Sequence, residues 1–140
     1  MGVVVYISRD VLDAIKAEAV AAGATECCGL LLSTNGSRRI DALRRAENVA
    51  AAPESCFEID PQALVAAYRA QRSGGPTIVG HYHSHPGGDP APSQADAAQA
   101  EARGEIWLIC TGDGNHAAAW IAHGTGSVHN VFDPAKMIVD

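Results

Sequence analysis

The chain has 140 residues, of which 47% are hydrophobic, and this predicts one domain over residues 1–140 with a buried core. Its 16 acidic and 10 basic residues give a net charge of −6, which argues against a nucleic-acid-binding surface. No apolar run reaches the length of a membrane span, and the first six residues lack the charged region and cleavage site of a secretory signal. We therefore expect a cytoplasmic protein that binds neither nucleic acid nor membrane.

The first half of the chain predicts a strand, a helix and a hairpin. The β-branched run at 3–7 favours a strand, and Ser8 is a good cap for the helix that follows. Apolar residues recur every three or four positions in that helix until Gly23 ends it. The apolar run 29–32 then indicates a buried strand, and the turn at Asn35 and Gly36 leads into another strand at 40–43.

The second half continues the alternation of helices and strands. Asp60 followed by Pro61 is a typical helix start, and Leu64, Val65 and Tyr68 form the expected packing stripe of that helix. We also expect a loop at 48–55, strands at 56–59, 77–80, 106–110, 117–121 and 128–132, and a helix from Ser93 to about Arg103. The order indicates a mixed α/β fold around one sheet.

The stretch 77–96 has the residues of a metal site. If the strand at 77–80 continues, His83 and His85 point to the same side, because strand side chains repeat every two residues. Prolines and glycines at 86–92 allow the loop to fold back, and a helix capped by Ser93 places Asp96 in its first turn. Two imidazoles and a carboxylate leave a fourth position for water, which is the pattern of a catalytic zinc site.

Simpler interpretations of these residues exist. Histidines in loops are usually solvated, and Ser93-x-x-Asp96 could be only a capping box at the positive end of a helix. A lone acid such as Glu26, at the edge of a predicted strand, is usually a solvated side chain. The capping and metal interpretations are compatible, because a ligand carboxylate also needs neighbouring donors to orient it.

These residues together resemble the signature of the JAMM (MPN-plus, JAB1/MPN/Mov34) metalloproteases. That signature is a Glu, then H-[ST]-H, seven residues, and S-x-x-D, and Glu26, His83, His85, Ser93 and Asp96 fill its positions. The segment that begins Glu26-Cys27-Cys28-Gly29 is similar to the family's E-x-C-G segment. The prokaryotic N…P…F…D-P pattern is matched by Asn48, Pro53, Phe57, Asp60 and Pro61.

The resemblance implies a fold, a cofactor and a role for each residue. The implied fold is a single mixed α/β domain, related to cytidine deaminases, with a central, mostly antiparallel sheet and about three helices. The implied cofactor is Zn2+, held by His83, His85 and Asp96. Glu26 would act as general base and acid, and Ser93 would donate a hydrogen bond to the oxyanion. The implied enzyme is a zinc metallopeptidase or isopeptidase.

The resemblance also implies a class of substrate. Hydrolases of this family cut peptide or isopeptide bonds after the C-terminal Gly-Gly of ubiquitin or ubiquitin-like proteins. Short members resemble prokaryotic enzymes that process ThiS- or MoaD-like sulfur carriers or remove small ubiquitin-like modifiers. The expected partner is therefore such a carrier protein, whose extended tail could pair with an exposed strand edge while its glycines approach the metal closely.

Two residues depart from the family pattern or compete with it. His81 stands where many members carry an aromatic residue, and it could support a ligand or be a rival ligand. Asp89 could also be a rival ligand, although a turn role beside Pro90 is favoured. The loop that follows His85 further resembles that of RadC-type proteins of unknown activity, but the Glu26 segment and the chain length favour the peptidase branch.

Other functional classes fit the sequence less well. A non-catalytic MPN-type interaction domain would have no chemical need for all five signature residues. A zinc deaminase requires H-x-E and P-C-x-x-C, and neither occurs in the chain. We expect the four cysteines, Cys27, Cys28, Cys56 and Cys110, to be reduced and buried as small hydrophobes, and His116, His123 and His129 to be surface or turn residues.

Overall fold

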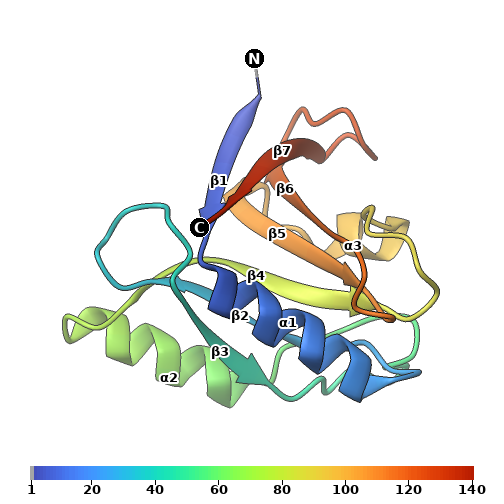
Figure 1. Cartoon of the computed structure of the whole chain (residues 1–140), viewed down its shortest axis with the longest axis horizontal. Helices are drawn as coiled ribbons and strands as arrows, with labels where there is room; N and C mark the ends of the chain where they lie inside the picture. Colours follow the sequence, from blue (N-terminus) through green and yellow to red (C-terminus); the bar gives the residue numbers. More distant parts are fainter. Residues whose placement is uncertain (1) are drawn as a thin grey trace.

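The computed structural model describes residues 2–140, which form one curled sheet of seven strands and three helices (Figure 1). The elements in chain order are β1 (Val3–Ile7), α1 (Arg9–Ala22), β2 (Cys28–Ser33), β3 (Ala42–Ala46), α2 (Pro61–Arg72), β4 (Thr77–His85), α3 (Gln94–Gln99), β5 (Arg103–Thr111), β6 (Ala117–His123) and β7 (Phe132–Val139). The strand order is β1-β7-β6-β5-β4-β2-β3. The pairs β1–β7 and β4–β5 are parallel and the others antiparallel, so the expected mixed fold with a mostly antiparallel sheet is confirmed. Within the described range, no helix has both the length and the apolar character needed to cross a membrane.

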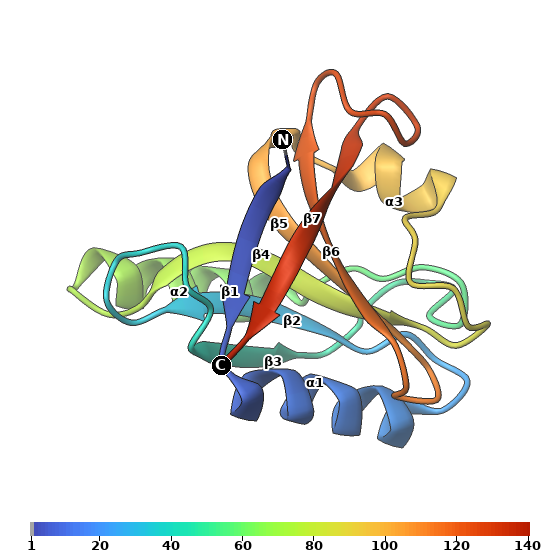
Figure 2. The same ribbon diagram turned by 45° about the horizontal axis from the view of Figure 1, so that its top comes forward.

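The sheet curls until its two edges meet at one point. Figure 2 shows β1, β6 and β7 running steeply across the direction of β2, β3 and β4. Ile7 at the end of β1 forms a parallel bridge with Ile40, which precedes β3. The Ile40 N–H donates to the Tyr6 carbonyl at 2.8 Å, and the Ser8 N–H donates to the Ile40 carbonyl at 2.9 Å. Because Ile40 bonds to β1, the expected strand at 40–43 begins only at Ala42.

The helices cover both faces of the sheet. Leu31 of β2 belongs to a buried cluster with α1, whereas its neighbours Leu30 and Leu32 pack with Ala67 of α2 on the opposite face. Alternation along the strand produces this division, since successive side chains point to opposite sides. The α3 residue Ala97 packs against Cys28 and its neighbours on the same face as α2. The predicted site also lies on this second face.

Two helices differ from the sequence-based expectation. The packing stripe of α2 was wrong in part, because Val65 and Tyr68 are 49% and 50% exposed while Ala67 is buried against the sheet. The helix that follows Ser93 ends at Gln99 rather than near residue 103. The chain turns there because the Glu105 carboxylate accepts hydrogen bonds from the backbone N–H groups of residues 101, 102 and 103, which a continuing helix would bond internally.

Two expected strands are also wrong. Residues 56–59 form a single bridge between Ile59 and Asn48 instead of a strand. At the C-terminus, Val128 and Phe132 likewise form only a bridge, and the strand is β7, which pairs with both β1 and β6. The sequence hides β7 because Pro134 interrupts its apolar run. All four cysteines are free, but Cys56 is only partly buried, contrary to expectation.

The junction of β4 and β5 predicts a strong effect of substitution at Gly80. A Cβ atom at this position would overlap the Ile106 carbonyl oxygen, a backbone atom that cannot rotate away. We expect Gly80→Ala to lower the free energy of unfolding by about 3 kcal/mol in urea denaturation. Gly87→Ala is the matched control, because a Cβ there meets no atom within 4 Å. Equal midpoints for the two variants would contradict this packing.

Candidate metal centre

The two signature histidines lie together because β4 remains extended to its last residue. The ladder between β4 and β5 pairs His83 with Ile109 and His85 with Thr111, so both imidazoles leave the same face of the sheet. Their Nε2 atoms are 3.0 Å apart. The His85 Nδ1–H donates to the Asp89 carbonyl at 2.6 Å, which leaves the Nε2 lone pair of His85 facing His83.

Asp96 reaches the histidines from the first turn of α3. The Asp96 N–H donates to the Ser93 hydroxyl at 3.1 Å, and the Ser93 N–H donates to Asp96 Oδ2 at 2.9 Å, which completes a capping box. Asp96 Oδ1 lies 3.1 Å from His83 Nε2, and Oδ2 lies 3.1 Å from His85 Nε2. The capping box and the position beside both histidines therefore coexist in one side chain.

Glu26 lies beside the histidines on the side of β4 where β2 pairs with it. It lies just before β2, where the Cys27 N–H donates to the Ser84 hydroxyl at 2.9 Å and the Ser84 N–H donates to the Cys27 carbonyl at 3.1 Å. Glu26 is buried, and its carboxylate, His83 and His85 each offer a ligand atom within 4.8 Å of the others. Its Oε1 atom has no hydrogen-bond partner among residues 2–140.

The side chain of Asn48 holds the backbone around Glu26. Its amide donates to the Glu26 carbonyl at 2.9 Å and to the Cys56 carbonyl at 3.1 Å. Its oxygen accepts from the N–H groups of Ala50 and Glu58, both at 3.0 Å. Asn48 thus replaces the missing strand at 56–59 with side-chain hydrogen bonds. In the sequence, Asn48 could be singled out only through the family pattern.

The donor set fits zinc. Three side chains bring imidazole nitrogens and carboxylate oxygens to within 3.0–3.1 Å of one another. Ligand atoms around a tetrahedral zinc at about 2.0–2.1 Å are separated by about 3.3–3.4 Å, so small outward movements would accommodate the ion. Lone pairs this close repel each other unless a proton or a cation lies between them, and two nitrogens with a carboxylate are ligands that zinc accepts.

Burial and hydrogen bonding set the charge of each group. Burial lowers the pKa of His83, which keeps this imidazole neutral and able to donate a lone pair. Burial also lowers the pKa of His85, but its hydrogen bonds to Asp96 and to the Asp89 carbonyl raise it more. Burial would raise the pKa of Asp96, yet its contacts with the two histidines hold that pKa well below its usual range. Burial raises the pKa of Glu26 to about 7.

His81 and Asp89, the possible rival ligands, have other contacts. In the described part of the chain, neither residue belongs to the group whose ligand atoms lie within 4.8 Å of one another, and neither has the contacts to both signature histidines that Asp96 has. His81 packs edge-on against Trp107, with ring centroids 4.2 Å apart. The Asp89 carboxylate accepts from the Ala91 N–H at 3.1 Å, which is the turn role expected beside a proline.

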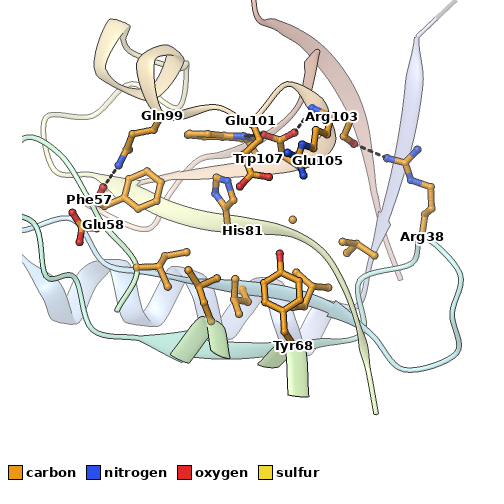
Figure 3. A pocket seen from close by; sticks show the side chains of 17 residues that line it. Arg38, Phe57, Glu58, Tyr68, His81, Gln99, Glu101, Arg103, Glu105 and Trp107 are labelled. Carbon is orange, nitrogen blue, oxygen red and sulfur yellow. Dashed lines mark hydrogen bonds between the residues drawn. The ribbon is translucent and has the colours of Figure 1, made fainter. Parts of the chain in front are cut away.

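A cavity of about 630 Å³ lies next to the histidines, between α2 and the first residues of β4 and β5 (Figure 3). The side chains of Tyr68 and His81 both point into it. Phe57 borders the cavity and stacks on His83 with ring centroids 4.2 Å apart, so the cavity and the site share a wall. The sequence gives no signal for this cavity, because its lining comes from distant segments.

Comparison with known proteins identifies the family. The sequence model described as prokaryotic homologs of the JAB domain matches residues 8–123. The chain belongs to this family. A desampylase of Haloferax volcanii is 37% identical over 116 residues, which cover 80% of this chain and 84% of the relative.

Two further similarities agree with membership of the JAB family. A protein of Thermus thermophilus, named as a probable TtuB-protein conjugate cleaving protease, is 31% identical over 102 residues, covering 73% of this chain and 67% of the relative. The crystal structure of a JAB1/MPN domain protein from Archaeoglobus fulgidus superposes with a TM-score of 0.62 at 20% identity, covering 98% of this chain and 100% of the other. This last likeness concerns the fold.

The geometry predicts the metal content of the purified protein. We expect about one zinc per chain by mass spectrometry, and loss of it in His83→Ala, because His83 would supply one of the two nitrogen ligands. His116→Ala is the control, since His116 is exposed and its side chain lies outside the ligand cluster. Retention of zinc by His83→Ala, or its loss in both variants, would be incompatible with this site.

Proposed function

We propose that the chain is a zinc-dependent hydrolase that cleaves peptide or isopeptide bonds after the C-terminal Gly-Gly of a ubiquitin-like or sulfur-carrier protein. The observation that carries this proposal is the convergence of Glu26, His83, His85 and Asp96 at one point, where His85 alone of the four is partly exposed. The names of two relatives, a desampylase and a probable TtuB-protein conjugate cleaving protease, support the substrate class.

In this proposal His83, His85 and Asp96 hold the zinc and Glu26 moves the proton. Zinc, when bound, lowers the pKa of a coordinated water to about 7 and polarises a carbonyl group. Glu26 Oε1, which lacks a partner in the described chain, accepts the proton of the attacking water and passes it to the leaving amine. The backbone around Glu26 is held by Asn48, so this acid meets the water at a fixed position.

Ser93 contributes the oxyanion contact. Its hydroxyl oxygen already accepts from the Asp96 N–H, and its own hydrogen is left to donate. A donor placed at the oxyanion of the tetrahedral intermediate typically lowers the barrier by about 3 kcal/mol. The capping box thus fixes the hydroxyl on the side of the site where Asp96 lies.

The cavity beside the histidines suits the tail of the substrate. The β4–β5 ladder starts at Gly80 and Ile106, so residues 77–79 of β4 have no β5 partner and Ile78 and Val79 line the cavity. An extended tail can pair with such a strand segment, and its apolar side chains can contact the cavity walls. Glycines at its end allow the backbone to approach the metal, since no Cβ intervenes.

Cleavage of carrier fusions tests the proposed function. We expect the zinc-loaded protein to release the partner from a fusion that follows the Gly-Gly of a ubiquitin-like carrier, as seen by mass spectrometry of the products. Glu26→Gln should reduce kcat by about 10²–10⁴-fold, because general-base catalysis is lost, and should still bind zinc. Glu54→Gln, a change at an exposed acid, should match the wild type. Full activity of Glu26→Gln would show that the proton is moved by another group.

The cavity predicts a separate effect on substrate affinity. We expect Tyr68→Ala to raise KM about tenfold with little change in kcat, since about 1.4 kcal/mol of apolar contact with the tail would be lost. Tyr6→Ala is the matched control, because Tyr6 is similarly exposed but lies on β1 outside the cavity. An equal KM for both variants would mean that the tail binds elsewhere.

A further inference from the structure

Residues 86–93, here called the proline loop, connect His85 to Ser93 and therefore set where Asp96 lies relative to the histidines. Pro86, Pro90 and Pro92 lack an N–H group, so the loop cannot be held by a regular ladder of backbone hydrogen bonds. Its carbonyl groups must find donors elsewhere. The identity of these donors shows what fixes the loop.

Three ring N–H groups bind carbonyls of the proline loop. One is the His85 Nδ1–H on the Asp89 carbonyl, within the site itself. The Trp120 indole N–H donates to the Pro90 carbonyl at 2.9 Å, and His129 Nε2 lies 3.0 Å from the Pro92 carbonyl as its donor. Trp120 is in β6 and His129 is in the turn between β6 and β7, so the C-terminal hairpin holds the loop.

The contact at Pro92 acts directly on the site. The Pro92 carbonyl belongs to the same peptide group as the Ser93 N–H, and that N–H donates to Asp96 Oδ2 at 2.9 Å. Because a peptide group is planar and rigid, fixing its oxygen also fixes the direction of its N–H. Through this one peptide group, His129 is connected to Asp96 Oδ2, which lies 3.1 Å from His85 Nε2.

The backbone of the turn tolerates a histidine at position 129 but does not require one. His129 and Asn130 have φ angles of 53° and 61°, and the Val131 N–H closes the turn on the Val128 carbonyl at 3.0 Å. Turns with two left-handed residues favour Asn and Gly, and Asn, Asp and His are the non-glycine residues that adopt this conformation most often. The hydrogen bond from the His129 imidazole to the Pro92 carbonyl explains a histidine at this position, whereas the turn alone does not.

The hairpin is itself anchored to the site. Val128 and Val131 pack against the buried cluster that contains Phe57 and Trp107, and Ala97 of α3 packs against the same cluster. Phe57 in turn stacks on His83. The donors therefore extend from a part of the molecule that is fixed relative to the ligands rather than from a loose loop.

We propose that Trp120 and His129 are positioning residues of the metal centre, which hold the proline loop so that Ser93 and Asp96 face His83 and His85. The inference rests on the proposed function for its catalytic consequence, and on the hydrogen bonds alone for its effect on the site. Neither side chain is among the ligands, and both act through backbone carbonyls.

The test uses substitutions that remove the donors and little else. Trp120→Phe deletes the indole N–H and keeps an aromatic ring, while His129→Asn keeps a residue that tolerates the left-handed turn. We expect each to weaken zinc affinity about tenfold in a chelator competition, and the double variant more, because such supporting contacts typically affect metal affinity about 10–100-fold. The melting temperature of His129→Asn should not fall. In the active enzyme, kcat should drop with KM unchanged, and His129→Gln should restore part of it.

A control variant and a measurement on metal-free protein test the hydrogen bonds independently of the proposed function. His123→Asn lies in the same hairpin, where His123 bonds Asp133 and not the proline loop, and it should match the wild type. In metal-free protein, the Ser93 amide proton should exchange about tenfold faster in the double variant, as measured by NMR. Zinc affinity and Ser93 exchange within twofold of wild type would overturn the inference. Zinc binding without cleavage of Gly-Gly fusions would instead refute the proposed function alone.

Discussion

Two hydrogen bonds between Cys27 and Ser84 join parts of the site that are 57 residues apart in the chain. One is an ordinary backbone contact, and the other uses the hydroxyl of Ser84, which lies between the two histidines in the sequence but on the opposite face of β4. Together they bring Glu26 beside His83 and His85, which no local interaction could do. Since both residues are buried, an unpaired Cys27 N–H would cost about 1–3 kcal/mol. The serine within the H-S-H motif is therefore a structural requirement for the arrangement of the acid.

The site lowers the stability of the fold, because it buries polar atoms that have no hydrogen-bond partner in the described part of the chain. Glu26 Oε1 and His83 Nδ1 have no hydrogen-bond partner within residues 2–140, and both are buried. Aromatic neighbours such as Phe57 surround His83 and exclude water, which strengthens electrostatic interactions at the site. Buried polar groups without partners are rare in proteins and tend to mark places where function has outweighed stability. The rest of the sheet, with its continuous apolar clusters, offsets this cost.

Much of the site could be predicted because its signals are local. The period of two along β4 and the capping pattern after Ser93 depend on neighbouring residues, and both elements begin where the sequence indicates. What failed depends on distant contacts. The expected strand at 56–59 is replaced by the hydrogen bonds of Asn48, and β7 forms despite Pro134 because β1 and β6 lie on either side of it. The cavity and the donors to the proline loop are likewise assembled from segments far apart in sequence.

The Asp96 carboxylate helps to fix α3 and also lies beside both histidines. Its Oδ2 atom accepts from the Ser93 N–H and lies 3.1 Å from His85 Nε2, and its Oδ1 atom lies 3.1 Å from His83 Nε2. The six residues of α3 are too few to persist as an isolated helix, so the capping box is part of what keeps this segment in place. An apolar replacement of Asp96 would remove one of the two hydrogen bonds of the capping box together with the carboxylate. The histidines of β4 are different, because backbone bonds hold the strand whatever side chains it carries. Relatives that keep this fold but have no metal site are therefore expected to have lost His83 and His85 before Asp96.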